Sequence, residues 1–230
     1  MPHADSNNNS YLGLSMKRTL IAAAFAAATL AGSAHAAAIN GLVNTGKADQ
    51  GQQDTNYALT AVISDTATGA YGYVSHDNQW PINPWLGNDD TSRWITPTAR
   101  QDQSLDASAS GSYTFHLSFD LTGFNAASAG FSGRFSADNA AEIKLNGVTI
   151  ATGTGFTSWH EFGATSGFVA GVNSLDFVLT NFAQGSGNPA GLRVEFTESN
   201  IAAVPEPETY AMLLAGMGLV GFAARRRKQG

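Results

Sequence analysis

A strict alternation of apolar and polar side chains between residues 113 and 122 constrains the fold of this chain more than any other feature. Because successive side chains of a β-strand point to opposite faces, one face of this segment collects all of its large apolar residues. The segment is therefore predicted to be a strand with one buried and one solvated face. The buried set is Tyr113, Phe115, Leu117, Phe119 and Leu121, and the solvated set is Thr114, His116, Ser118, Asp120 and Thr122.

The same two-residue period recurs at 175–180 and at 192–197. Between 143 and 150, the pair Asn146-Gly147 supplies the positive φ angles of a type I′ turn, which predicts a β-hairpin. Eight or nine strands with no convincing amphipathic helix between them predict an all-β fold, an antiparallel β-sandwich of the jelly-roll type. In the 192–197 strand the polar positions Arg193, Glu195 and Thr197 are expected to face solvent, and further strands are expected near 57–63, 70–75, 93–96 and 131–135.

Composition allows one such domain and excludes several kinds of site. The chain has 230 residues, of which 43% are hydrophobic and 13% charged, enough for a single core of ordinary size. It has no cysteine, which excludes disulfides, thiolate zinc sites and a cysteine nucleophile. The cellular compartment must therefore be inferred from the ends of the chain.

The N-terminal region has the three parts of a secretory signal peptide at residues 16–36. Two basic residues are followed by an apolar core and by a small-x-small cleavage site at Ala34 and Ala36. Residues 1–15 are polar and would weaken such a signal, so we expect them to be a mis-assigned or non-native start and translation to begin at Met16. The signal implies an export translocase and a signal peptidase as partners. The alternative is a buried alanine-rich helix of the domain.

The C-terminal run of residues 204–228 has the layout of a membrane anchor. Its uncharged part, 210–224, would rise about 22 Å as a helix, against about 30 Å for the hydrocarbon core of a bilayer. It is predicted to be a marginal, single transmembrane helix. The alternative is a buried helix ending in a basic cap. The basic residues after it are expected to stay cytoplasmic, which leaves the upstream chain outside: Arg225, Arg226, Arg227 and Lys228.

The triplet Pro205-Glu206-Pro207, followed by an apolar stretch and an arginine cluster, resembles the PEP-CTERM sorting signal of exported proteins of Gram-negative bacteria. The resemblance implies that exosortase, a membrane transpeptidase-like enzyme, recognises the triplet and that the basic cluster stops transfer. It also implies a precursor held transiently in the inner membrane with a periplasmic domain, and a final location at the cell surface or in the polysaccharide of a biofilm matrix. The two prolines are expected to keep the triplet extended and non-helical. The predicted domains are the signal peptide, a sandwich at 37–203 and a sorting signal at 204–228.

The exported part is acidic. Residues 37–204 contain six Lys or Arg and fifteen Asp or Glu, a net charge of −9. Nucleic acid is therefore excluded as a partner, because binding to phosphates requires positive charge. Contact with an anionic polysaccharide would need a bridging cation or a neutral patch.

The stretch from Tyr113 to Glu195 also resembles galactose-binding-like β-sandwiches. The resemblance is carried by Ala137-Asp138-Asn139 before the hairpin, by residues 168–177 and by Gly191-Leu-Arg193-Val194-Glu195, with 90–97 fitting the same pattern. It implies sugar binding in many members, often with a structural calcium ion, while other members bind nothing known. No cofactor is required, and calcium is the single candidate. Oxygen ligands would come from Asp138 and Asn139.

One loop has the composition of a sugar site. In "NQWPINPWLGNDDTSRW", residues 78–94, aromatic side chains stand beside Asn and Asp, and aromatic faces next to hydrogen-bonding groups commonly hold sugar rings. The alternative for the first two tryptophans is packing against the sandwich, and for the aspartates a role in turns or as calcium ligands. Trp94 alternates with its neighbours and is expected in the core. The candidate ligand-binding residues are Trp80, Trp85, Asp89 and Asp90.

Catalytic motifs are missing from the sequence. His160-Glu161 lacks the second histidine of H-E-x-x-H, and no G-x-S-x-G occurs, so no catalytic residue is assigned and the protein is predicted not to be an enzyme. A secreted glycoside hydrolase, the weaker alternative, would need a carboxylate pair about 5 to 9 Å apart, such as Asp89 with Asp90 or Glu142 with Glu161. Two main hypotheses follow: a carbohydrate- or calcium-binding module of the matrix, or a structural or adhesive matrix protein without a small ligand.

Overall fold

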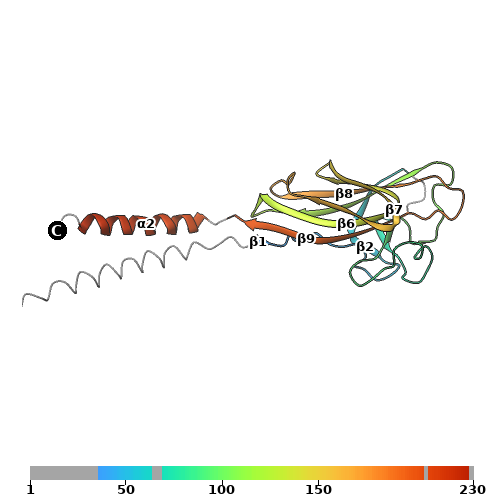
Figure 1. Cartoon of the computed structure of the whole chain (residues 1–230), viewed down its shortest axis with the longest axis horizontal. Helices are drawn as coiled ribbons and strands as arrows, with labels where there is room; N and C mark the ends of the chain where they lie inside the picture. The colour runs from blue at the N-terminus through green and yellow to red at the C-terminus, as the bar shows by residue number, and fades with distance from the viewer. Residues whose placement is uncertain (1–35, 64–68, 205–206, 228–230) are drawn as a thin grey trace, which may run out of the picture. The chain divides into compact units, whose positions relative to one another are not determined.

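The computed structural model describes residues 36–63, 69–204 and 207–227, and the chain divides into two compact units (Figure 1). All strands of the described residues belong to the unit Ala36–Ala203. The sequence predicted a sandwich at 37–203. The other unit contains the C-terminal helix, and each unit is described separately. The elements are β1 Ala36–Ala37, β2 Gln53–Val62, β3 Tyr71–Val74, β4 Ile95–Thr96, β5 Gly111–Asp120, β6 Phe124–Leu145, β7 Val148–Ala164, β8 Val172–Asn181, β9 Gly191–Ala203 and α2 Pro207–Arg227.

The strands join into a closed antiparallel ring. Their order is β1-β9-β4-β3-β2-β5-β8-β6-β7, and a further pairing of β6 with β9 closes the ring. The pairs formed by these strands are antiparallel, and β5 with β8 keeps one register over ten residue pairs. The all-β antiparallel sandwich predicted from the alternation is therefore confirmed.

Strand β6 connects the two halves of this ring. Its first part, up to Asp138, pairs with β9, and its last part, from Ala140, pairs with β8. Strand β7 follows both parts of β6 as a long hairpin partner. The crossover between Asp138 and Ala140 places Asp138 opposite Gly191 of β9 and Ala140 opposite Thr180 of β8.

The sandwich has two different ends. At the end that we call the loop end, the long connections 75–94, 97–110 and 182–190 gather around the β6 crossover, as Figure 1 shows. At the opposite end, the turn end, the turns 121–123 and 146–147 and the loop 165–171 lie beside the last residues of β9. Two hydrogen bonds join these turns: Leu121 N–H donates to Gly171 O at 2.8 Å, and Asn146 Nδ2 donates to Gly167 O at 2.8 Å.

The core forms where the alternation predicted it. All five apolar residues of the 113–121 segment are at most 3% exposed. An aromatic cluster continues the core, with Phe162 at its centre. The ring centroid of Phe162 lies between 5.5 and 6.1 Å from those of Phe131, Phe135, Phe177 and Phe196.

Local turn chemistry was also predicted well, whereas strand lengths were not. Asn146 and Gly147 have φ angles of 50° and 82°, so the predicted type I′ hairpin is confirmed. The strand expected at 93–96 is shortened to β4, because Arg93 N–H bonds instead to Thr45 O in the segment that precedes β2. The strand expected at 131–135 is one part of the 22-residue β6.

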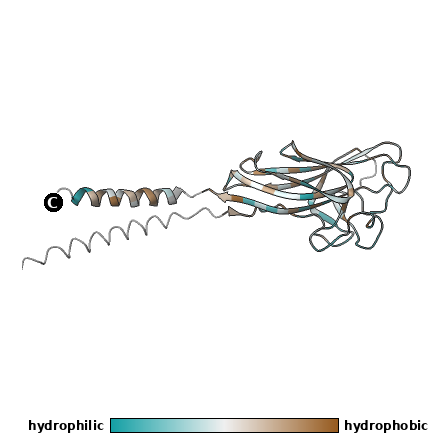
Figure 2. Ribbon diagram, viewed as in Figure 1, coloured by the Kyte–Doolittle hydropathy of each residue, from teal (hydrophilic) through white to brown (hydrophobic). Residues whose placement is uncertain are grey.

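The C-terminal helix requires a correction. Helix α2 contains the predicted segment 210–224, but among the residues that the structure describes, no helix has both the length and the apolar character needed to cross a bilayer. Glu208 lies in its first turn and three arginines in its last, and Figure 2 shows the hydrophilic C-terminal end. Pro207, expected in an extended triplet, is the first residue of α2, a position where proline is well tolerated.

The predicted signal residues lie largely outside the described part of the chain. Residues 1–35, and with them Ala34, are not described, and neither are Pro205, Glu206 and Lys228. Ala36, at the predicted cleavage site, is the first residue of β1 and pairs with Ala202 of β9.

Candidate functional site

Trp80 is the aromatic residue of the 78–94 loop that faces solvent. Its side chain is 44% exposed at the loop end. The buried side chain of Gln101 fixes the backbone beside it, because Nε2 donates to the carbonyl oxygens of His76, Gln79 and Trp80 at 3.3, 3.0 and 3.3 Å. One buried amide thus contacts three carbonyls of the loop, two of them at Trp80 and the residue before it, and the exposed indole is presented from a fixed backbone.

Trp85, five residues further on, has the opposite environment. It is 3% exposed, its ring lies 4.3 Å from that of Trp94, and its indole N–H donates to Asp138 Oδ2 at 2.8 Å. The ring also covers Gly191 so closely that a Cβ there would collide with it. Trp85 is packed against Trp94 and Gly191 and is not accessible to a ligand, so we correct its place among the candidate ligand residues. Trp94 is fully buried, as the alternation predicted.

Asp138 and Asn139, the predicted calcium ligands, lie at the β6 crossover. The Asp138 carboxylate is bound by Trp85 on one oxygen and by Asn139 Nδ2 on the other, at 2.8 Å each, while Asn139 Oδ1 accepts the amide of Phe182 at 2.6 Å. Burial raises the pKa of Asp138 to about 6, and the Trp85 hydrogen bond offsets part of that effect. Within the described ranges no group of three or more His, Asp or Glu side chains could hold a metal ion. Calcium binding here remains a prediction.

Asp89 and Asp90 are adjacent in sequence but have different environments. Asp89 Oδ1 accepts the amides of Thr91 and Ser92 at 2.8 and 3.1 Å, and Oδ2 pairs with Arg193 at 2.9 Å. Partial burial raises the pKa of Asp89, but these amide bonds and Arg193 outweigh it, and the net shift is downward. Asp90 is exposed. Asp89 is therefore a turn and ion-pair residue, one of the alternatives that the sequence left open.

A buried charge network underlies this loop and was not predicted. Arg193 and Glu195, expected on the solvated face of their strand, are 1% and 2% exposed. Arg193 contacts Ser92 Oγ at 2.6 Å, Glu195 Oε1 at 3.3 Å and the carbonyl oxygen of Gly87. Glu195 Oε2 also pairs with Arg134 at 2.6 Å. The alternation gave the correct outward direction, but the 86–92 segment folds over that face and buries both side chains.

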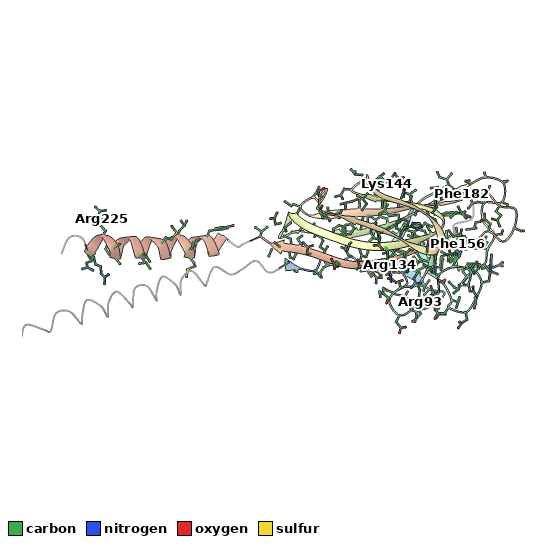
Figure 3. All side chains as sticks on the ribbon, in the orientation of Figure 1. Arg93, Arg134, Lys144, Phe156, Phe182 and Arg225 are labelled. Atoms are coloured by element: carbon green, nitrogen blue, oxygen red, sulfur yellow. The ribbon has the colours of Figure 1, made fainter. Side chains whose placement is uncertain are left out.

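Two further aromatic residues lie near the network and the loop end: Phe182, which was not predicted, and Trp159, whose role the sequence left open. Phe182, 50% exposed, begins the loop after β8 and lies at the loop end with Phe156 (Figure 3). Trp159 of β7 stacks with the guanidinium groups of Arg134 and Arg193, whose central carbons lie 4.5 and 4.9 Å from its ring centre. No sequence signal distinguished Phe182 from the many core phenylalanines.

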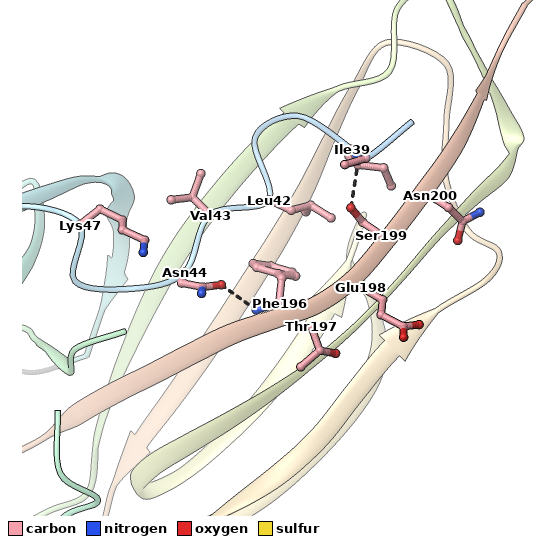
Figure 4. A pocket seen from close by; sticks show the side chains of 11 residues that line it. Ile39, Leu42, Val43, Asn44, Lys47, Phe196, Thr197, Glu198, Ser199 and Asn200 are labelled. Atoms are coloured by element: carbon pink, nitrogen blue, oxygen red, sulfur yellow. Dashed lines mark hydrogen bonds between the residues drawn. The ribbon is translucent and has the colours of Figure 1, made fainter. Parts of the chain in front are cut away.

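A groove of about 740 Å³ follows β9 between its pairing with β4 at Leu192 and its pairing with β1 at Ile201 (Figure 4). Its floor is apolar, from Leu42, Val43 and Phe196, and its rim is polar. Two side chains substitute for strand partners along it: Asn44 Oδ1 accepts the amide of Phe196 at 2.7 Å, and Ser199 Oγ accepts that of Ile39 at 3.1 Å. This mixture suits a small polar ligand with one apolar face.

The carboxylate pairs considered for a hydrolase have separate partners. Glu142 accepts a hydrogen bond from Thr149 and pairs with Lys144 at 3.1 Å. These bonds hold its pKa below the ordinary value, whereas a general acid needs a raised one. Glu161 stands opposite Arg134 in the β6–β7 register, and Glu142 stands opposite Thr152.

Comparison with solved structures finds partial likenesses to carbohydrate-active proteins. A family 35 carbohydrate-binding module from an environmental isolate is similar at 16% identity, covering 64% of this chain and all of that one, with a TM-score of 0.28. A β-glucuronidase of an uncultured Clostridium species is 16% identical over 61% of this chain, and a putative β-galactosidase of Bacteroides fragilis 15% over 45%, with TM-scores of 0.34 and 0.31. This chain spans only 28% and 18% of those two enzymes. At such TM-scores the likenesses carry no conclusion about ligand or activity.

Comparison with protein families identifies the tail. The search of curated proteins found no match to the chain. Residues 203–228 match the PEP-CTERM protein-sorting motif, which confirms the resemblance seen in the Pro-Glu-Pro triplet, the apolar stretch and the arginine cluster. The motif implies export, a membrane-anchored precursor and processing by exosortase. This chain therefore carries a PEP-CTERM sorting motif behind an antiparallel β-sandwich.

Proposed function

We propose that the sandwich of this exported protein is a non-catalytic carbohydrate-binding module that acts in extracellular polysaccharide. The contact surface is the loop end, with Trp80 as the stacking residue. The observation that carries the proposal is the exposed indole of Trp80 on a backbone held by Gln101.

A fixed aromatic surface suits sugar recognition for two reasons. The apolar face of a pyranose ring stacks on an indole, and a loop that is already ordered loses little conformational entropy on binding. Exposed amides stand around Trp80 in the sequence and offer hydrogen bonds to hydroxyl groups: Asn78, Gln79 and Asn83. Phe182, at the same end, offers a second apolar surface.

The proposal favours a neutral ligand surface and needs no cofactor. The module has a net charge of −9, so an anionic polymer would be repelled unless a cation such as calcium bridged the two. Retention should therefore be compared with calcium and with a chelator.

The direct test is retention of residues 37–204 on polysaccharide purified from the producing organism. Replacing Trp80 by alanine should weaken binding about tenfold or more, because an exposed aromatic anchor typically contributes at least 1.4 kcal/mol. Trp80→Phe keeps an aromatic face and should retain part of the affinity. Val148→Ala removes an exposed apolar side chain at the turn end and is the matched control.

Three outcomes would contradict the proposal. No retention under any condition would favour a structural or adhesive protein without a small ligand. Loss of binding in Glu198→Gln with full binding in Trp80→Ala would move the ligand to the β9 groove. Release of reducing sugars from the polysaccharide would make the protein a hydrolase.

A further inference from the structure

The turns at the turn end carry little charge for an acidic module. Of the 21 Asp, Glu, Lys and Arg residues between 37 and 204, none occurs in the turns 121–123 and 146–147, in the loop 165–171 or in residues 199–204. This end does carry the exposed Asp120, the last residue of β5, which stands opposite Val172 and whose carboxylate is bound by the amide and the hydroxyl of Thr122 at 2.8 and 2.7 Å. The uncharged segments at this end are 121–123, 145–148, 165–175 and 199–204.

Three valines are exposed on this surface. Val148 and Val172 are each 68% exposed and Val169 is 49% exposed. They belong to adjacent turns, because Asn146 Nδ2 donates both to Gly167 O and to Asn173 Oδ1, at 2.8 and 2.9 Å. The hairpin that carries Val148 is thereby tied to the loop that carries the other two. We call these three exposed valines on adjacent turns the apolar patch; the exposed Asp120 stands opposite Val172 in the β5–β8 register.

The position of this end in the chain indicates what it meets. Strand β9 ends at Ala203 beside Phe124, so the chain leaves the sandwich at the turn end. The sorting motif begins at that same residue, and α2 starts at Pro207. Because the motif implies a membrane-anchored precursor, the turn end is the part of the sandwich that is nearest to the anchor along the chain.

Electrostatics supports the same partner. A module with a net charge of −9 is repelled by the negative surface potential of anionic lipids, and the repulsion falls off within about a Debye length, roughly 10 Å. The turn end, whose turns carry no charge beside Asp120, can approach such lipids at a lower electrostatic cost than the more acidic remainder of the module. Exposed valines then gain by leaving water for the interface.

We propose that the turn end is a membrane-docking surface, on which Val148, Val169 and Val172 contact the lipid interface while the precursor is anchored. This inference rests on the export and anchoring implied by the sorting motif. It does not depend on sugar binding. The docked sandwich keeps its loop end, and Trp80 with it, on the side away from the lipid.

The test uses the full chain in vesicles of phosphatidylcholine and phosphatidylglycerol that carry a nitroxide quencher at the headgroups. The chain has no cysteine, so each introduced cysteine gives a single labelling site. A fluorophore on Ala127→Cys reports on the turn end and one on Ser186→Cys on the loop end, and both positions are exposed. We expect strong quenching at 127 and none at 186. The triple variant Val148→Asn, Val169→Asn, Val172→Asn should abolish the quenching at 127 without changing the unfolding temperature.

Each other result counts against docking. Equal quenching at both positions, or undiminished quenching in the triple variant, would show that the tether alone determines the proximity to lipid. Shielding at 127 that depends on protein concentration and not on lipid would assign the patch to a second copy of the chain. Flotation of the vesicles provides the separate check on anchoring: a chain that does not float with the lipid refutes the premise, whereas one that floats without quenching refutes docking alone.

Discussion

Replacing Asp138 by asparagine tests whether the crossover site is as buried as the structure shows. Asp138 is 5% exposed, and burial raises its pKa from an ordinary 3.8 to about 6. Between these values the folded state holds more protons than the unfolded state, so this group makes the protein less stable as the pH rises from about 4 to 6. The shift of about two units corresponds to at most about 3 kcal/mol.

In Asp138→Asn that pH dependence should disappear. The substitution also disturbs the hydrogen bonds to Trp85 and Asn139, and the part of this effect that depends on ionisation is already contained in the net rise of the pKa. The free energy of unfolding of both proteins is measured by urea titration between pH 3.5 and 7.5 in the presence of a chelator. The value for the variant minus the value for the unmodified protein should increase as the pH rises. A difference that stays constant across this range would refute the burial argument.

A matched control exists at the turn end, and calcium provides a second comparison. The pKa of exposed Asp120 is lowered by the hydroxyl and amide of Thr122, so Asp120 stabilises the folded state at neutral pH and the effect is lost as the pH falls through that lowered pKa. Asp120→Asn should thus show the opposite pH trend. If Asp138 and Asn139 bind calcium, adding the ion at pH 7 should stabilise the unmodified protein and leave Asp138→Asn unchanged.

The remaining predictions concern packing, the charge network and sorting. Gly191→Ala should lower the free energy of unfolding by about 1–3 kcal/mol, because the new Cβ collides with the Trp85 ring; thermal unfolding checks this, and an equal loss in a Trp85→Leu background would contradict it. Arg193→Met should lower the free energy of unfolding by about 3–5 kcal/mol, because it leaves Glu195 with one fewer partner in a buried site. Urea titration measures this loss, and a much smaller loss would show that the pair behaves as a surface ion pair. Replacing the Pro-Glu-Pro triplet at 205–207 by alanines should block exosortase processing, so that the tail mass remains on membrane-bound protein in mass spectra; unchanged release would argue against the sorting role.

The local features of this fold were predictable from sequence because their causes are local. The two-residue period of 113–121 set the buried face of β5, and Asn146-Gly147 set the hairpin turn. In both cases the relevant physics, side-chain alternation or a positive φ, lies within a few consecutive residues. The arginine-ended motif of the tail was found for the same reason, since its parts are contiguous.

The site depended on contacts between distant segments, and there the sequence was insufficient. Trp80 and Trp85 share a loop and similar neighbours, yet Trp85 is buried because the glycine at 191 leaves room for its ring. Arg193 points outward as its strand position predicts, but the 86–92 segment covers it. The alternation in the sequence predicted the direction of such side chains, but it could not show which distant segments cover them.

The most direct measurement of the central claim is the indole N–H spectrum of the sandwich during titration with the native polysaccharide. The chain has four tryptophans, and each gives one signal: Trp80, Trp85, Trp94 and Trp159. The signal of Trp80 should shift and saturate, while those of buried Trp85 and Trp94 should stay in place. A titration in which the Trp80 signal does not move while the polysaccharide binds would contradict binding at the loop end.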